Sequence, residues 1–219
     1  MTDPFAPRKE TAAAWFRSLR DRIVAAFEAA EAGVIGAGPG LEGAAPVPDA
    51  PGRFEVTPTR RASDDGSDAG GGIMSVLRGG RLFEKVGVNV STVHGRLGGA
   101  AQRAMAARGV PGMAEDPRFW ASGISLVAHM RNPHVPAVHM NTRMFWTPGA
   151  WWFGGGADLN PCLEYPEDTA HFHDRLRAAC DAHGPELYAR YRDWADRYFF
   201  IAHRNRARGV GGIFYDDLN

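Results

Sequence analysis

Apolar residues recur every four positions near the start of the chain. Trp15, Leu19, Ile23 and Phe27 follow this spacing with charged residues between them. That is the pattern of an amphipathic helix with one buried face. The sequence therefore predicts a helix over residues 9–32.

The stretch 33–72 has no regular apolar period and is rich in Gly, Pro, Asp and Ala. It predicts a long loop, partly disordered, with at most a short strand at Phe54–Val56. A loop of this length in a compact domain is usually either functional or disordered. The segment ASDDGSDAGGG (62–72) is the part least expected to become ordered on its own, because it has few apolar groups to bury.

Apolar and polar residues begin to alternate after residue 83. KVGVNVST (85–92) alternates in this way, as do ASGISLVAHM (121–130) and AVHMNTRMFW (137–146), and each predicts a half-buried strand. Pro133 and Pro136 lie between the last two segments and favour a turn there. These two strands are therefore expected to pair as an antiparallel hairpin. The Gly/Ala/Arg segment 97–109 predicts a short helix.

The last third of the chain is mainly helical in pattern. Residues 166–183 begin with acidic side chains and end before Gly184, which predicts one helix. A longer helix is predicted at about 186–206, and a further strand begins near residue 210. Strands and late helices without regular βαβ alternation predict an α+β fold with a mainly antiparallel sheet, in a single domain over 1–219.

Composition excludes several classes of protein. The apolar fraction is 44% and the charged fraction 23%, and 25 basic residues balance 25 acidic ones. A net charge of zero gives no electrostatic footprint for nucleic acid or an anionic membrane. No apolar run is long enough to span a membrane, and the N-terminus lacks the pattern of a secretory signal. Cys162 and Cys180 have no paired spacing, so neither a disulfide framework nor a structural zinc site is expected. We therefore expect a cytoplasmic protein.

The two hairpin strands each place polar side chains on one face. Ser125 and His129 share a face of the first strand, and His139, Asn141 and Arg143 share a face of the second. If the two faces coincide, the patch suits an acidic ligand with hydrogen-bonding groups, because Arg binds carboxylates through a planar fork. The alternative is the ordinary solvated face of a half-exposed sheet.

The segment WWFGGGADLNP (151–161) is rich in glycine and contains one acid, Asp158. It lacks the spacing G-x-G-x-x-G and the Lys-Ser/Thr of a P-loop, and it does not lead into a helix N-terminus. Phosphate binding is therefore not favoured. The segment predicts a tight backbone, or one that a ligand approaches closely, presenting Asp158. The alternative is that Asp158 caps the next turn.

Four histidines are candidate metal ligands, although their spacing matches no compact metal motif. Imidazole is also a common acid/base and hydrogen-bonding group, so that interpretation stays open beside the metal. The four are His129, His139, His173 and His203.

Several long segments resemble the oxygen-dependent coproporphyrinogen III oxidases of haem biosynthesis. They are FEKVGVNVSTVHG, GISLVAHMRNPHVPAVHMNTRMF, WWFGGGADLNP and DWADRYFFIAHRNRARGVGGIFYDDLN, in the family's order from Phe83 to Asn219. The resemblance implies a large flat antiparallel sheet flanked by helices on both sides, and a homodimer. It implies oxidative decarboxylation of two propionates of coproporphyrinogen III to vinyls, giving protoporphyrinogen IX. Dioxygen is the co-substrate, and no metal or organic cofactor is required.

The resemblance also assigns roles to residues. It makes His139 a proton donor, and it places Asp158 against the pyrrole N–H groups, where it could also take a proton. The glycines before Asp158 would give the macrocycle room to approach, and Arg143 would pair with a propionate. Bacterial members are further proposed to bind a divalent cation through the four histidines named above. The implied substrate-binding residues are Ser125, Asn141, Thr142 and Arg143.

The chain departs from the family pattern at Ala195, usually Cys, at Arg206, usually Glu, and at Tyr215, usually Phe. Family members continue past the final Asp-Asp-Leu-Asn with further strands, helices and part of the dimer interface, so we expect a C-terminally incomplete chain. Two other hypotheses stand beside the enzyme. One is a truncated, non-catalytic porphyrin-binding or dimer-forming fragment, and the other is a metal-dependent oxygenase that uses the four histidines.

Overall fold

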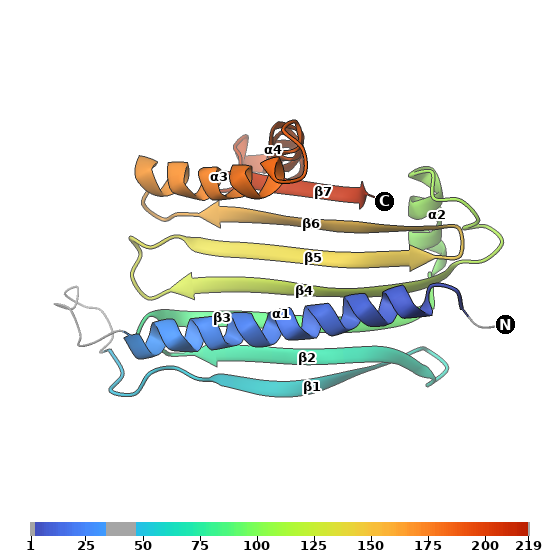
Figure 1. The fold of residues 1–219 in the computed structure, drawn as a ribbon, viewed down its shortest axis with the longest axis horizontal. Helices are drawn as coiled ribbons and strands as arrows, with labels where there is room; N and C mark the ends of the chain where they lie inside the picture. Colours follow the sequence, from blue (N-terminus) through green and yellow to red (C-terminus); the bar gives the residue numbers. More distant parts are fainter. Residues whose placement is uncertain (1–2, 34–46, 219) are drawn as a thin grey trace.

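A computed structural model describes residues 3–33 and 47–218, except for the side chains of 217 and 218. Its centre is one seven-stranded antiparallel sheet in which each strand pairs with its neighbours in sequence (Figure 1). The strands are β1 (Phe54–Ala62), β2 (Asp68–Arg78), β3 (Phe83–Arg96), β4 (Arg118–Met130), β5 (Ala137–Thr147), β6 (Ala150–Asn160) and β7 (Gly212–Leu218). The helices are α1 (Ala6–Gly33), α2 (Gly99–Ala107), α3 (Pro166–Asp181), α4 (Leu187–Tyr198) and the short 3₁₀ helix η1 (Ala202–Arg204). The predicted α+β class with a large antiparallel sheet is confirmed.

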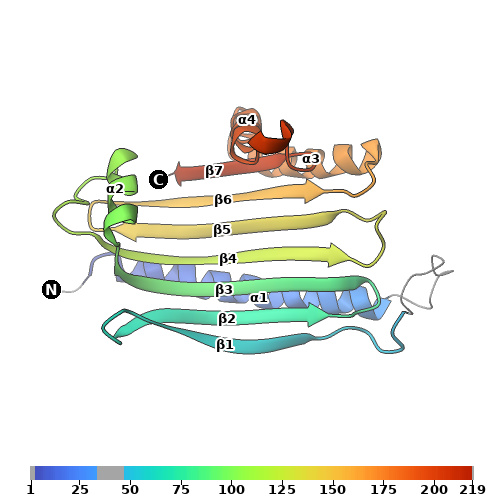
Figure 2. The same cartoon turned by 180° about the vertical axis from the view of Figure 1, so that it is seen from behind.

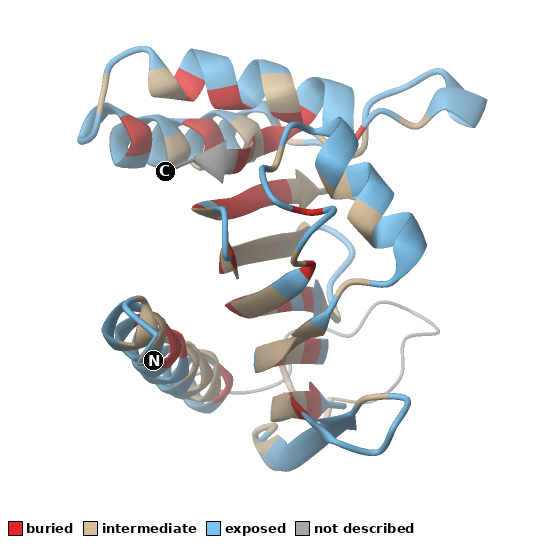
Figure 3. Cartoon of the chain, turned by 90° about the vertical axis from the view of Figure 1, so that its right-hand side faces the viewer, coloured by how far each residue is buried: buried red, intermediate tan, exposed pale blue. Residues whose placement is uncertain are grey.

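Helix α1 covers one face of the sheet and forms the main core with it (Figure 3). Phe16 of α1 is buried, and so are Val86, Val88 and Val90 of β3, the residues whose alternation predicts that strand. Side chains that alternate along a strand point to opposite faces, so this set selects the face that α1 covers. The predicted helix and strand are therefore joined in one core.

Helices α3 and α4 pack along β7, the last strand of the sheet. The rings of Tyr191 and Tyr215 lie 5.2 Å apart between centroids, and those of Trp194 and Phe214 lie 5.5 Å apart. Figure 2 shows the face opposite α1, where β3, β4 and β5 have no helix lying along them and α2 stands at one end. On this face, none of the described helices therefore lies along the central strands.

The expectation of a loop over 33–72 holds at residues 47–53 but is wrong over most of 54–72, and residues 34–46 lie outside the described residues. Strand β1 and the start of β2 occupy most of 54–72. The segment 62–72 forms the turn between them and the beginning of β2. A Cβ at Gly71 would lie 2.2 Å from the carbonyl oxygen of Thr59, and one at Gly72 would lie 2.1 Å from that of Val90. Close pairing with neighbouring strands orders this segment, which its composition alone could not reveal.

Two further boundaries differ from the sequence predictions. The segment 151–161, expected as a tight backbone that presents Asp158, lies mostly in strand β6 and pairs with both β5 and β7. The helix predicted over 186–206 ends at Tyr198 because the chain turns there to pack Phe199 against Phe214. Apolar spacing continues past this turn, and it could not show that the helix stops.

None of the helices in the described ranges is long and apolar enough to cross a membrane. Cys162 is exposed and Cys180 is buried, and both are free thiols. This agrees with the expectation that no disulfide framework is present.

Candidate functional site

The polar patch predicted from the hairpin lies on the face opposite α1. Strands β4 and β5 pair in the predicted antiparallel way, with Ser125 opposite Asn141 and Gly123 opposite Arg143. Strand β6 adds Asp158 opposite His139. These residues share one face because paired positions in an antiparallel sheet point the same way. A cavity of about 340 Å³ lies over Ser125, Asn141 and Arg143.

Asp158 is a fully buried carboxylate surrounded by side-chain donors. Its oxygens accept hydrogen bonds from His139 Nδ1 at 2.8 Å and from Asn160 Nδ2 at 2.7 Å. They also accept from Nε and Nη2 of Arg208, at 2.9 and 2.8 Å. Burial raises the pKa of Asp158, but the bonds from His139, Arg208 and Asn160 outweigh it and hold the pKa below its usual range. The carboxylate is therefore an anion whose two oxygens are both engaged.

His139 is oriented by this carboxylate. An ionised carboxylate only accepts hydrogen bonds, so Nδ1 of His139 has the proton, and Nε2 of the neutral ring is an acceptor. Nδ2 of Asn141 lies 3.4 Å from that Nε2. This arrangement leaves Oδ1 of Asn141 buried without a hydrogen-bond partner in the described part of the chain. A ligand with N–H groups would satisfy this oxygen.

A second buried carboxylate, Asp216, lies on the same face in β7. It accepts from Nη2 of Arg143 and from Nη2 of Arg108, each at 3.0 Å, and from Nε1 of Trp152 at 3.1 Å. Sequence analysis did not single out Asp216, Arg108 or Arg208. Period-two alternation in a strand at 212–218 would have placed Asp216 on the face of Phe214. Arg108 and Arg208 lie outside the strands, and no periodicity predicts their position.

The glycines before Asp158 make room for β7. A Cβ at Gly154 would lie 2.3 Å from Oδ1 of Asp216. One at Gly156 would lie 2.8 Å from the carbonyl oxygen of Ile213 and 3.2 Å from the ring of Phe214. At these two positions the close neighbour of the glycine is therefore the protein's own strand β7.

A family model described as coproporphyrinogen III oxidase matches residues 12–219. The chain belongs to this family. It is 42% identical over 211 residues to the oxygen-dependent coproporphyrinogen-III oxidase of Rickettsia bellii (strain RML369-C), a match that covers 96% of this chain and 68% of that protein. It is 50% identical over 159 residues to the mitochondrial oxygen-dependent coproporphyrinogen-III oxidase of Rattus norvegicus, covering 69% of this chain and 36% of the relative.

The oxygen-dependent coproporphyrinogen-III oxidase of Drosophila melanogaster is also 50% identical over 159 residues, which is 40% of its length. The chain therefore corresponds to less than half of these animal relatives and to about two thirds of the bacterial one. These matches agree with the resemblance found in the sequence motifs.

One of the substrate residues implied by the family lies away from the others. Thr142 alternates with Asn141 and Arg143 along β5, so its side chain points to the face that α1 covers. Its Oγ1 lies 3.5 Å from the hydroxyl of Tyr215. A cavity of about 580 Å³ on that face is lined mainly by apolar side chains, including those of Trp15 and Phe153. Among the described residues that line it, Arg8 is the charged side chain. The grouped acid and imidazole described above lie on the opposite face.

The four histidines implied as metal ligands do not form a cluster. His173 is buried with both ring nitrogens engaged, one by the hydroxyl of Tyr188 and one by the carbonyl of Val210, each at 2.9 Å. His129 is exposed near the end of β4, and His203 is exposed in η1. Within the described ranges, no group of three or more His, Cys, Asp or Glu side chains could hold a metal ion.

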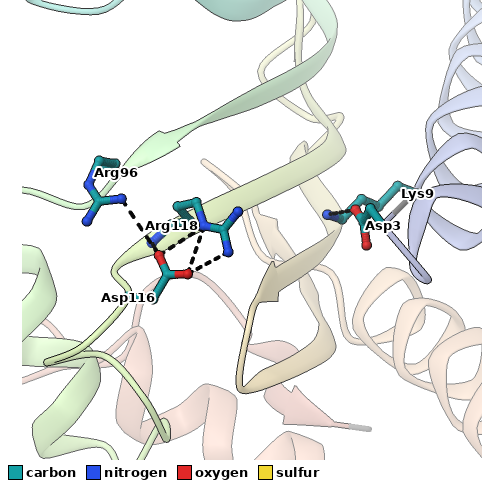
Figure 4. Close-up of polar contacts among 5 residues, drawn as sticks. All are labelled: Asp3, Lys9, Arg96, Asp116 and Arg118. Atoms are coloured by element: carbon teal, nitrogen blue, oxygen red, sulfur yellow. Dashed lines mark hydrogen bonds and ion pairs between the residues drawn. The ribbon is translucent and has the colours of Figure 1, made fainter. Parts of the chain in front are cut away.

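Another group of charges lies outside the candidate site. Asp116 is paired with Arg118 at 2.6 Å and with Arg96 at 3.7 Å, and Asp3 is paired with Lys9 at 2.7 Å (Figure 4). The side chain of Asp116 is 31% exposed, and both of its arginines are about 60% exposed, at 59% and 63%. Solvent screens such pairs, so they indicate little about function.

Proposed function

We propose that this protein is an oxygen-dependent coproporphyrinogen III oxidase. It would convert two propionates of coproporphyrinogen III to vinyls and give protoporphyrinogen IX. Family membership supports the reaction class. Within the structure, the main support is the unpartnered Oδ1 of Asn141 beside the oriented ring of His139. The substrate has pyrrole N–H donors that match this oxygen and carboxylates that match Arg143.

The spacing along β5 agrees with one macrocycle lying flat on the open face. His139 and Arg143 are four residues apart on one strand, so their Cα atoms are separated by about 13 Å. Asn141 lies between them and lines the cavity of about 340 Å³. The pyrrole N–H groups would meet Asn141, and a rim carboxylate would meet Arg143.

The reaction consumes one proton for each propionate. The propionate side chain loses carbon dioxide, one proton and two electrons, and a C=C bond forms. Dioxygen takes up the two electrons and two protons and becomes hydrogen peroxide. One of these protons comes from the substrate and the other must be supplied. We propose that His139 supplies it from Nε2 after that nitrogen has been protonated. The adjacent carboxylate of Asp158, 2.8 Å from Nδ1, stabilises the resulting imidazolium.

Asp158 has a positioning role in this proposal. Direct contact between its carboxylate and the pyrrole N–H groups would require Arg208 to leave first, because both oxygens are already engaged. We therefore infer that Asp158 acts through His139. A divalent cation on the four histidines has no place in the proposal, because both ring nitrogens of His173 are engaged. Metal analysis of the active protein tests this point.

The proposal includes the homodimer that the family resemblance implies and the cytoplasmic location expected from the composition and the two cysteines. Analytical ultracentrifugation of the purified chain tests the first, with sedimentation as a monomer as the contradicting result. Cell fractionation tests the second, and recovery in an organelle or membrane fraction would contradict it.

An oxygen electrode tests the function. The 219-residue chain is mixed with coproporphyrinogen III without added metal, and we expect one dioxygen consumed for each propionate converted, with protoporphyrinogen IX as product. His139→Gln should lower turnover by about 100-fold. His171→Gln, an exposed histidine of α3, is the matched control and should leave turnover unchanged. Porphyrin binding without oxygen consumption would support the non-catalytic binding fragment instead.

A further inference from the structure

Asn89 of β3 is an exposed amide on the polar face, and the proposed reaction does not use it. It pairs with Ser125 of β4, and Ser125 pairs with Asn141 of β5. Paired positions of an antiparallel sheet point the same way, so the three side chains form one row across the face opposite α1 (Figure 2). All three line the cavity of about 340 Å³. Asn89 therefore extends the candidate site onto β3.

The side-chain amide of Asn89 is oriented by the neighbouring strand β2. Its Oδ1 accepts a hydrogen bond from the backbone N–H of Ser75 at 3.2 Å. An asparagine amide has an oxygen that accepts and a nitrogen with two N–H donors, so this bond fixes which atom is left for a ligand. Nδ2 lies beside Gly87, where an added Cβ would be 3.7 Å from it. Within the described part of the chain Nδ2 donates to no protein acceptor, so its N–H groups are available on the polar face.

Asn89 and Asn141 present opposite hydrogen-bonding atoms to the same cavity. The unpartnered Oδ1 of Asn141 is an acceptor, whereas Nδ2 of Asn89 is a donor. The two residues lie two strands apart, which is about 10 Å at the usual spacing between paired strands. A ligand that satisfies both residues therefore has a donor over Asn141 and an acceptor over Asn89.

Arg143 supplies donors on the other side of Asn141. Its guanidinium extends towards β7, where Nη2 donates to Asp216 at 3.0 Å. Strand β7 is the second strand from β5 in one direction, and β3 is the second in the other. Donors therefore lie on both sides of one acceptor, in the order Asn89, Asn141 and Arg143. A tetrapyrrole has the complementary order of groups, with N–H groups at its centre and carboxylates on its rim.

We propose that Nδ2 of Asn89 donates a hydrogen bond to a rim carboxylate of the substrate, opposite the carboxylate that meets Arg143. Asn89 is thereby a specificity-determining residue. A hydrogen bond from an amide N–H to an ionised carboxylate is stronger than one to a neutral acceptor, so this contact favours a carboxylate at the rim. The inference rests on the proposed function and extends the contact with the substrate across the sheet from β5 to β3.

A binding titration with two porphyrins tests the inference. One ligand is coproporphyrin III, the stable oxidised form with four carboxylates, and the other is the same macrocycle with all four converted to amides. Asn89→Ala removes the donor without adding charge. It should weaken binding of the tetracarboxylate by about tenfold and binding of the tetraamide by about twofold, because hydrogen bonds to charged groups contribute more.

Asn89→Asp keeps an oxygen for the N–H of Ser75 and replaces the donor with a negative charge. It should weaken binding of the tetracarboxylate more than Asn89→Ala does. It should not weaken binding of the tetraamide, whose own N–H groups can donate to the new carboxylate. Asn132→Asp is the matched control, because Oδ1 of this exposed asparagine also accepts a backbone N–H, that of His134 at 3.0 Å, in the turn between β4 and β5. It should bind both ligands as the parent protein does.

The inference fails alone in three cases, all with a parent protein that binds the tetracarboxylate. If both variants of Asn89 bind it as the parent does, Asn89 makes no contact with a carboxylate. If only Asn89→Asp binds it more weakly, repulsion by the added charge explains the loss. If both variants weaken the two ligands equally, Asn89 acts through the pairing of β2 with β3, and a circular dichroism melting curve would show the lower stability. If the parent protein binds neither porphyrin, the proposed function fails and this inference fails with it.

Discussion

Glu31 and Asp158 are both fully buried carboxylates, yet their surroundings differ in kind. Glu31, in the last turn of α1, accepts hydrogen bonds from the backbone N–H groups of Gly52, Arg81, Leu82 and Phe83 at 2.7–2.9 Å. Within the described residues, each donor to Asp158 is a side chain. In each case burial raises the pKa, and the hydrogen bonds more than offset it and leave the pKa below its usual range.

The difference in donors indicates that Glu31 has a structural role and that Asp158 belongs to the candidate site. Backbone donors cannot rotate away without unfolding their segment, so Glu31 ties α1 firmly to the connection between β2 and β3. The space around it is full, because a Cβ at Gly80 would lie 2.3 Å from its Oε1. Side-chain donors can change rotamer, and one donor to Asp158 is an imidazole that can exchange protons. The first carboxylate therefore serves the fold, and the second serves the proposed chemistry.

The largest effect is expected from Glu31→Gln. The amide presents its own N–H groups to backbone N–H groups that now donate to the carboxylate, so the free energy of unfolding should fall by about 3–5 kcal/mol. Urea denaturation followed by circular dichroism measures it. Glu28→Gln is the control, since among the described residues Glu28 accepts one backbone N–H, that of Phe54, and pairs with Arg53 nearer the surface. It should lose about 1 kcal/mol or less. Equal losses of unfolding free energy in the two variants would contradict the special structural role of Glu31.

Asp158→Asn should affect turnover strongly and stability less. The amide no longer stabilises the imidazolium of His139, so kcat should fall by about 100-fold while KM changes by less than about threefold. The loss of stability should be smaller than for Glu31→Gln, because Arg208, 40% exposed, can turn toward solvent. Steady-state oxygen consumption and a urea titration give the two values. Turnover near that of the parent protein would remove Asp158 from the mechanism.

Low pH should lower the free energy of unfolding through both Glu31 and Asp158. A carboxyl whose folded pKa lies below its unfolded value of about 4 stabilises the fold fully above that pH. The contribution disappears as the pH falls through the lowered folded pKa. We therefore expect the unfolding free energy of the parent protein to decline below about pH 4, and Glu31→Gln to show a shallower decline. Urea titrations between pH 2 and 7 measure this, and parallel curves for the two proteins would contradict it.

The smallest effect is expected from Arg118→Gln. The side chain of Arg118 is 59% exposed and that of its partner Asp116 is 31% exposed, so solvent screens the attraction between them (Figure 4). We expect no measurable change in thermal stability or in turnover. A clear loss of either would mean that the exposed arginine pairs matter as much as the buried carboxylates do.

Much of the fold and part of the site could be predicted from the sequence. Alternation placed Val86, Val88 and Val90 in the core and put Asn141 and Arg143 on one face of a strand. It failed for most of β1 and for the start of β2, where glycine and polar residues suggested a loop, and it did not predict β6 as a strand. Those segments are strands because neighbouring backbones pair with them closely, as the 2.1 Å between a Cβ at Gly72 and the oxygen of Val90 shows. The spacing of apolar residues along the sequence does not reveal such pairing between strands.

The sequence by itself determined which side chains share a face, because the direction of a side chain follows from its position along a strand. It also determined the family, through long motifs in a conserved order. Only the tertiary structure decided which donors surround each carboxylate. Arg208 reaches Asp158 from 50 residues away, and Arg108 reaches Asp216 from 108 residues away. Contacts across such separations depend on how helices and strands pack, so the roles of Glu31, Asp158 and Asp216 became distinct only in the folded chain.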